Sequence, residues 1–197
     1  WIAGVAGHED DARTFASLAE EFRASLLDSL RRSMAYHRID YLPGCVELGD
    51  FDATSTTVAL FPVDEAGLNN QGRLPLAAVE ATFDRYWSFF VDRRDGATKT
   101  TWEAYTPYEN RAIGALVRLG RRDRAHDLVR YFLDDQRPRG WNAFAEVVWR
   151  DPTRPSFIGD IPHTWCGSDY VNSFRSLFIY EREVDDALVL FHGVTRL

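Results

Sequence analysis

Apolar residues recur every three or four positions between Asp10 and Tyr36, and this spacing constrains the fold more than any other feature of the sequence. A repeat with this period places its side chains on one face of an α-helix. Asp10 or Asp11 can cap the first turn, because a carboxylate accepts hydrogen bonds from free backbone N–H groups. The residues of the repeat are Phe15, Leu18, Phe22, Leu26, Leu27, Leu30 and Met34. The sequence therefore predicts a long amphipathic helix over residues 10–36.

A pair of helices is predicted further along the chain. The segment Thr106-Pro107-Tyr108-Glu109 has the form of a capping box with proline at the first helical position, so we interpret Glu109 as structural. Gly120 ends this helix, and Asp123 begins the next one, which runs until Pro138. The very short connection predicts an αα-hairpin.

Two more helices and one strand complete the prediction. One helix begins at Pro75 and stops near Gly96, and the last begins at Ser168 or Asp169. The apolar run at 187–191 is more typical of a strand. We expect an all-α fold of helical hairpins with long loops, in which residues 1–186 form the helical domain and residues 187–197 a strand-like exit segment.

Composition narrows the possible partners. The chain has 197 residues, of which 45% are apolar, and a net charge of -7 without any basic run. Nucleic acid and acidic membrane surfaces both need clustered cations, so neither is an expected partner. Cys45 and Cys166 do not make a disulfide framework or a metal-binding spacing, and we expect two free thiols. Neither a metal nor a cofactor is predicted, and the compartment stays open.

The predicted loops at 40–73, 96–105 and 138–167 carry most of the chemically versatile side chains. Loops this long are uncommon in compact domains unless they are functional. Connections at one end of a ring of helical hairpins can gather over a central cavity. The side chains that would meet there are Glu47, Asp50, Asp52, Trp102, Glu103, Trp141, Glu146, Asp160, His163 and Trp165.

Carboxylates across a cleft, together with tryptophans that stack on sugar rings, are what glycoside hydrolysis requires. One carboxylic acid protonates the leaving oxygen, and a second carboxylate acts as base or nucleophile. Each residue also has a simpler interpretation: Asp50 and Asp52 can cap turns, Glu103 can be a solvated loop residue, and Trp141 can belong to the core. A calcium site that combines Asp50 and Asp52 with Asp160, His163 and Asp169 has no support from spacing.

A family resemblance agrees with this chemistry. Residues 141–180, which begin WNAFAEVVW and contain GDIPHTW, resemble the closing segment of a six-hairpin (α/α)6 toroid glycosidase. This segment belongs to the C-terminal part of the toroid. The segments YLPGCVELGDFDATSTT at 41–57 and DDALVLFHGV at 185–194 resemble a cavity-facing loop and an exit segment of such toroids. The resemblance implies a glycosidase that acts on a carbohydrate substrate, with Glu146 as the general base.

The resemblance also implies roles for the other candidates. Trp165 would stack on a sugar, and Asp160 and His163 would hold its hydroxyls; the alternative is that they only fix the loop. The chain is too short for twelve helices, so we interpret it as half of a toroid that is completed by a missing N-terminal half or by another chain. The general acid would lie in that missing part, unless Asp50, Asp52 or Glu103 serves.

Two other functions stay open. Residues 108–138 are typical of one tetratricopeptide-type helix pair, which would make the chain a scaffold that binds a protein or peptide. No second copy is visible on either side, although such repeats have to recur. The other possibility is a toroid that binds glycans without cleaving them.

Overall fold

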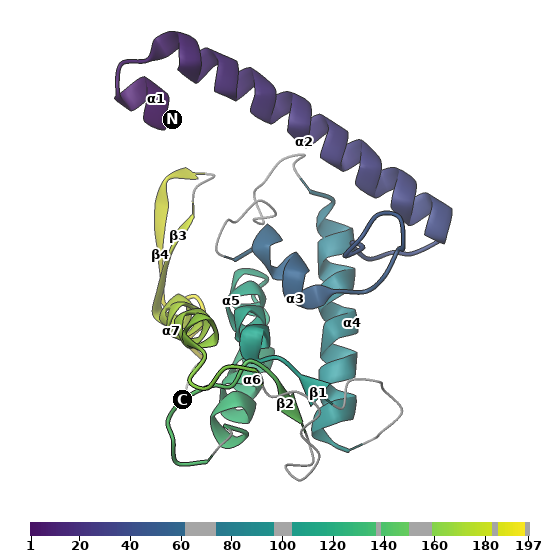
Figure 1. Cartoon of the computed structure of the whole chain (residues 1–197), viewed down its shortest axis with the longest axis vertical. Helices are drawn as coiled ribbons and strands as arrows, with labels where there is room; N and C mark the ends of the chain where they lie inside the picture. The colour runs from purple at the N-terminus through teal and green to yellow at the C-terminus, as the bar shows by residue number, and fades with distance from the viewer. Residues whose placement is uncertain (62–73, 97–103, 137–138, 150–158, 183–184, 196–197) are drawn as a thin grey trace.

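The computed structural model describes residues 1–61, 74–96, 104–136, 139–149, 159–182 and 185–195, and these are mostly helical (Figure 1). The N-terminal part contains α1 (Ile2–Val5), α2 (Glu9–His37), α3 (Ala53–Thr56), the short 3-10 helix η1 (Thr57–Ala59) and α4 (Leu76–Arg94). The C-terminal part contains β1 (Ala104–Tyr105), η2 (Pro107–Asn110), α5 (Arg111–Arg118), α6 (Arg122–Asp134), β2 (Val148–Trp149), α7 (Thr164–Phe178), β3 (Ile179–Arg182) and β4 (Ala187–Leu190). The predicted helices over 10–36 and 75–96 are confirmed. The helix predicted from Asp123 to Pro138 is α6, which ends at Asp134, and the helix predicted from Ser168 or Asp169 is α7, which already begins at Thr164.

The core is built around α5, which is short and apolar enough to be covered on every side. Both α6 and α7 pack against it, as do α3 and η1. Every residue of α5 from Ala112 to Arg118 is buried. Gly114 allows the close approach of Phe61, because a Cβ at this position would lie 2.7 Å from the Phe61 ring. The predicted αα-hairpin is α5 and α6, joined through Gly120, and η2 precedes it where the sequence indicated one continuous helix.

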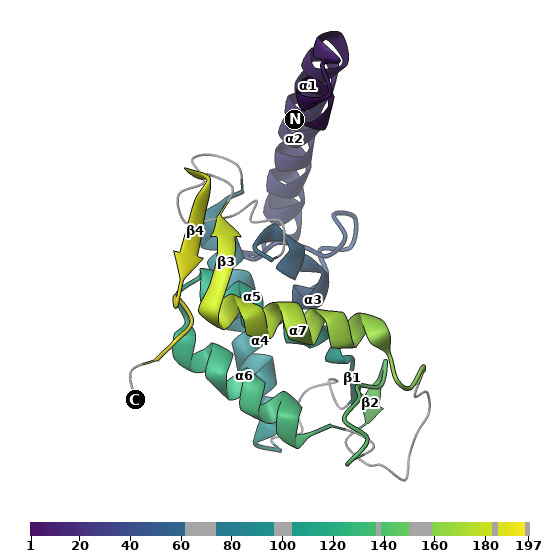
Figure 2. The same ribbon diagram turned by 90° about the vertical axis from the view of Figure 1, so that its left-hand side faces the viewer.

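The long helix α2 is confirmed, but its two halves differ. Only Leu27, Leu30 and Ser33 are buried, and all three lie toward its C-terminal end. Figures 1 and 2 show the N-terminal half projecting away from the body of the molecule. The apolar face predicted from the sequence is present, yet Phe15 is 60% and Phe22 73% exposed. His8, rather than Asp10 or Asp11, occupies the N-cap position, and its side chain makes no capping bond.

Strands pair in two places among the described residues. Ala104 and Tyr105 pair antiparallel with Trp149 and Val148, which links two of the predicted long loops. The predicted C-terminal strand is β4, and it pairs antiparallel with β3, which continues directly from α7. After this hairpin, Nε2 of His126 lies 2.8 Å from the Gly193 carbonyl oxygen, so the end of β4 returns to α6.

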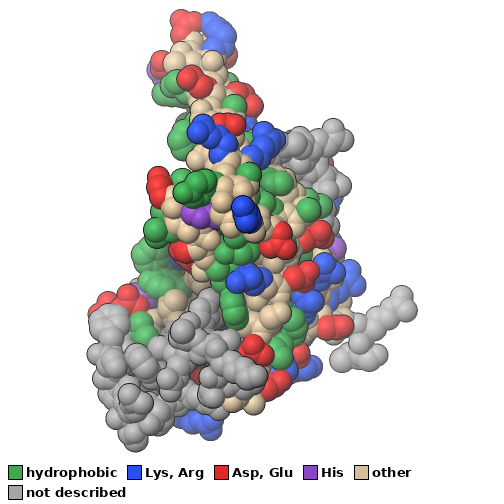
Figure 3. Space-filling model, turned by 90° about the vertical axis from the view of Figure 1, so that its right-hand side faces the viewer, with side chains coloured by type: hydrophobic (Ala, Val, Ile, Leu, Met, Phe, Trp, Pro, Cys, Tyr) green, Lys and Arg blue, Asp and Glu red, His purple; other side chains and the backbone are tan. Residues whose placement is uncertain are grey.

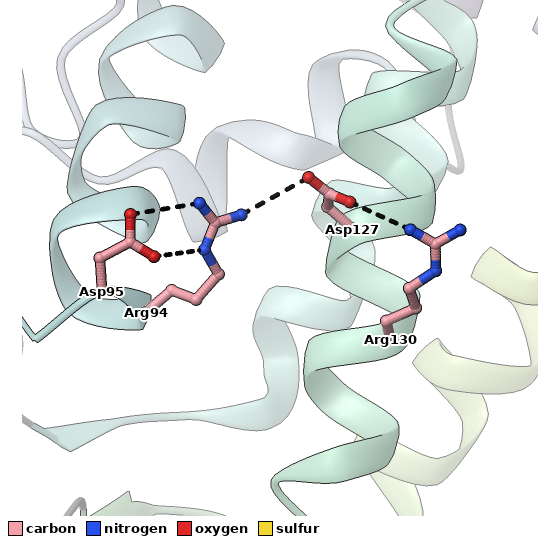
Figure 4. A network of polar contacts seen from close by, with 4 residues as sticks. All are labelled: Arg94, Asp95, Asp127 and Arg130. Atoms are coloured by element: carbon pink, nitrogen blue, oxygen red, sulfur yellow. Dashed lines mark hydrogen bonds and ion pairs between the residues drawn. The ribbon is translucent and has the colours of Figure 1, made fainter.

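Several polar contacts attach α4 to its neighbours, among them one buried network and one exposed network. In the buried one, Arg93 donates to both carboxylate oxygens of Glu109 at 3.0 and 2.7 Å, and the Tyr86 hydroxyl donates to the same carboxylate at 2.9 Å. In the exposed one, shown in Figure 4, Asp127 of α6 lies between Arg94 and Arg130 at 3.5 Å from each. The buried network connects α4 to η2, and the exposed one connects it to α6.

Candidate functional site

The segment that precedes α7 folds back on itself and brings Glu146 to Asp160. The Glu146 amide donates to the Asp160 carbonyl at 3.2 Å, and the His163 amide donates to the Phe144 carbonyl at 2.8 Å. Gly159 adopts a φ of +67°, and a Cβ added there would lie 2.2 Å from Oε2 of Glu146. Glycine is therefore required at this position for the backbone conformation and for the Glu146 side chain.

His163 and Tyr108 make the closest polar contact of the cluster. The Tyr108 hydroxyl lies 2.6 Å from Nε2 of His163, and the two rings meet edge to face. On its other side, Nδ1 of His163 lies 3.8 Å from Oδ2 of Asp160. The His163 side chain is 13% exposed and that of Asp160 is 85% exposed. His163 is thus held between a half-buried aromatic partner and a solvent-facing carboxylate.

Trp165 forms the exposed edge of the same cluster. Its ring meets that of Tyr108 edge to face at 5.4 Å, and the Arg111 guanidinium lies over both rings, 5.2 Å from Tyr108 and 5.6 Å from Trp165. Nε of Arg111 donates to Oδ2 of Asp169 at 2.8 Å, which fixes the cation. Because Trp165 is 58% exposed, an aromatic surface faces solvent beside an ordered set of polar groups.

The acidities of these groups reflect their partial burial. Desolvation raises the pKa of Tyr108, and the nearby Glu146 carboxylate adds to this effect. Burial raises the pKa of Cys166 to about 12, so the thiol is protonated and unreactive at neutral pH. Burial also raises the pKa of Asp169, although the Arg111 cation opposes the shift.

The structure brings together four of the residues predicted from the sequence and adds three that the sequence reasoning missed as site residues. Glu146, Asp160, His163 and Trp165 share this cluster. In the sequence, Tyr108 and Arg111 indicate only helix positions, and Asp169 indicates a helix start or a ligand of the calcium site that the spacing does not support. The chain distance between residues 108 and 163 hides their contact, which only the packing of η2 against α7 creates.

The predicted site residues of the 41–57 loop lie elsewhere, beside α3 rather than beside β1 and β2 (Figures 1 and 2). Asp52 caps α3 and accepts a bond from the Ser55 amide at 3.0 Å, while Asp50 accepts one from the Cys45 amide at 2.8 Å. Glu47 contacts the Cys45 thiol, and this hydrogen bond lowers its pKa. The structure therefore does not gather Glu47, Asp50 and Asp52 with the Glu146 cluster; the alternative interpretation as turn caps fits the two aspartates.

The remaining tryptophan and glutamate candidates are Trp141, Trp102 and Glu103. Trp141 is 66% exposed in the loop that follows α6. Trp102 and Glu103 lie outside the described residues.

Two further properties concern only the described part of the chain. None of its His, Cys, Asp and Glu side chains gather in threes or more to form a cation site. None of its helices has both the length and the apolar character that crossing a membrane requires.

Comparison of the chain with protein-family models, with curated proteins and with solved structures returned no match. The function of the cluster therefore has to be inferred from its geometry and chemistry.

Proposed function

We propose that this chain is part of an (α/α)6 toroid of the six-hairpin glycosidase type and contributes the base side of a site that hydrolyses a glycosidic bond. The observation that carries the proposal is the half-exposed Trp165 ring in the same ordered cluster as Glu146 and His163. An aromatic face next to directional hydrogen-bonding groups suits a sugar, which has apolar C–H faces and a rim of hydroxyls.

In this proposal Glu146 is the general base. Its carboxylate takes a proton from a water molecule as that water attacks the anomeric carbon, and the bond to the leaving group breaks on the opposite face of the sugar. The sugar stacks on Trp165, while His163 and Asp160 bond to its hydroxyls. Tyr108 and Arg111 hold His163 and Trp165 in place through the contacts described above.

The general acid has no assignment in this cluster. Asp50 and Asp52 have local hydrogen-bonding partners beside α3, and Glu103 lies outside the described residues. We propose that the acid comes from a missing N-terminal half of the toroid or from another chain.

Glycosyl fluorides test the base without the acid, since fluoride leaves with the bonding electron pair and needs no protonation. We expect the chain to release fluoride from one member of a panel of α- and β-glycosyl fluorides. Glu146→Gln should lower this rate by about 100-fold or more, because a positioned base contributes about that much. Binding of the matching oligosaccharide, measured by calorimetry, should persist in Glu146→Gln.

Matched variants separate the site from the rest of the surface. Trp165→Ala should weaken oligosaccharide binding, whereas Trp141→Ala removes a tryptophan of similar exposure and should leave this binding unchanged. Binding without fluoride release would indicate a non-catalytic glycan-binding toroid. If the chain neither binds an oligosaccharide nor releases fluoride from any member of the panel, the proposal is contradicted and the scaffold function is favoured.

A further inference from the structure

The projecting half of α2 carries an apolar stripe that its own chain leaves exposed. Phe15, Leu18, Phe22 and Leu26 are 60%, 55%, 73% and 42% exposed. Hydrophobic side chains follow one edge of this arm in Figure 3. Contiguous apolar surface of this kind is uncommon on a monomer and marks an interaction site.

A groove of similar character lies at the base of the arm. It is a pocket of about 470 Å³ between α2 and the α3 region, and Phe22, Leu26, Leu30, Val58 and Ala59 are among its lining residues. The stripe therefore runs without interruption from the free arm into an apolar hollow on the body.

The two halves of α2 carry opposite charges. Residues 9–22 hold five carboxylates and a single arginine, whereas residues 23–37 hold three arginines and a single carboxylate. An antiparallel helix with the same charge distribution would place its acidic half on the basic half of α2. Opposite charges then meet at both ends of the contact.

We infer that two copies of this chain pair through α2 in an antiparallel, two-fold symmetric arrangement. The arm of each copy lies along the groove of the other, so that Phe15 and Leu18 of one copy cover the pocket of its partner. A second copy fits both the apolar pattern and the charge pattern at once, and a two-fold axis repeats each contact. This interface goes beyond the proposed glycosidase function and does not depend on it.

The exposed apolar area of the arm is small for a permanent dimer. The four stripe residues expose on the order of 400 Å² of apolar surface per copy. Both copies together then approach the roughly 1,200 Å² of a small specific interface once the flanking polar residues are included. We therefore expect a dimer that dissociates on dilution rather than a permanent one.

Sedimentation velocity of the whole chain over a wide concentration range tests the inference. We expect a monomer that converts to a dimer as concentration rises. The double variant Leu18→Glu and Phe22→Glu should weaken the dimer by about 100-fold or more, because it buries charge in the apolar seam. Val171→Glu alters an exposed apolar residue of α7 and should have no effect. Circular dichroism checks that each variant is folded.

Charge reversal tests the antiparallel direction. Two double variants reverse the charges, one on the arm (Asp10→Arg with Asp11→Arg) and one at its base (Arg31→Asp with Arg32→Asp). Measured by itself, each variant should dimerise at least about tenfold more weakly than the unchanged chain. An equimolar mixture of the two should recover the dimer, since each acidic segment again meets a basic one. A chain that stays monomeric at all concentrations, or a dimer unaffected by the changes at Leu18 and Phe22, would overturn the inference.

Discussion

Replacing Glu109 by glutamine should destabilise the protein strongly, because it removes the carboxylate that pairs with the buried Arg93 cation. Glu109 is 3% and Arg93 7% exposed, and both oxygens of the carboxylate are occupied by Arg93, one of them also by Tyr86. Removing one partner of such a pair costs about 3–5 kcal/mol, since the remaining charge stays desolvated. This is a large part of the roughly 5–15 kcal/mol that stabilises a typical domain.

Urea unfolding followed by circular dichroism measures this loss directly. Asp127→Asn is the matched control, because Asp127 also pairs with arginine but is 38% exposed. We expect Asp127→Asn to lower the free energy of unfolding by less than about 1 kcal/mol, because the pair is at the surface. Arg93→Met combined with Glu109→Gln should recover part of the stability, because neither charge of the pair then remains. Equal losses for Glu109→Gln and Asp127→Asn would refute the reasoning.

Two further predictions concern the site and its surroundings. Gly159→Ala should reduce fluoride release by about tenfold or more, because the new Cβ displaces the Glu146 carboxylate and the backbone is held at a φ of +67°; unchanged release would show that Glu146 does not need its observed position. Burial raises the pKa of Cys166 from 9.0 to about 12. As pH rises, the thiol therefore loses its proton in the unfolded chain before it does so in the folded chain. The free energy of unfolding should fall between pH 9.0 and about 12 as a result. Urea titrations over that range should give a shallower fall for Cys166→Ala, and identical pH profiles would contradict the effect of burial on this thiol.

The helices were predictable because their signals are local. The period of the apolar residues located α2, and proline and glycine located the ends of the α5–α6 hairpin within a few residues. The sequence did not indicate which half of α2 would be buried. Burial depends on which other elements reach it, and periodicity alone carries no information about that.

Glu109 shows how a correct general interpretation can miss the physical cause. The capping box indicated a structural role, and Thr106 does cap η2 by accepting a bond from the Tyr108 amide. The Glu109 carboxylate, however, faces Arg93 and Tyr86 of α4. Arg93 is 16 positions and Tyr86 is 23 positions from Glu109 in the sequence, and both separations are beyond the reach of a local motif.

The candidate site was only partly predictable for the same reason. Glu146, Asp160, His163 and Trp165 stand close together in the sequence, and the fold keeps them together. Tyr108 joins them through the packing of η2 against α7, and Arg111 through the packing of α5 against α7. Asp50 and Asp52 were grouped with Glu146 on the expectation that long loops share one end of the molecule, whereas their carboxylates make local bonds beside α3.

The most direct test of the proposed function is a crystal structure of Glu146→Gln with the oligosaccharide identified by the binding measurements. We predict that a sugar ring stacks on Trp165, that His163 contacts a hydroxyl, and that the residue-146 amide faces the anomeric carbon within reach of one water molecule. An oligosaccharide bound elsewhere on the chain, or a residue 146 side chain turned away from the anomeric carbon, would contradict the assignment of Glu146 as the base.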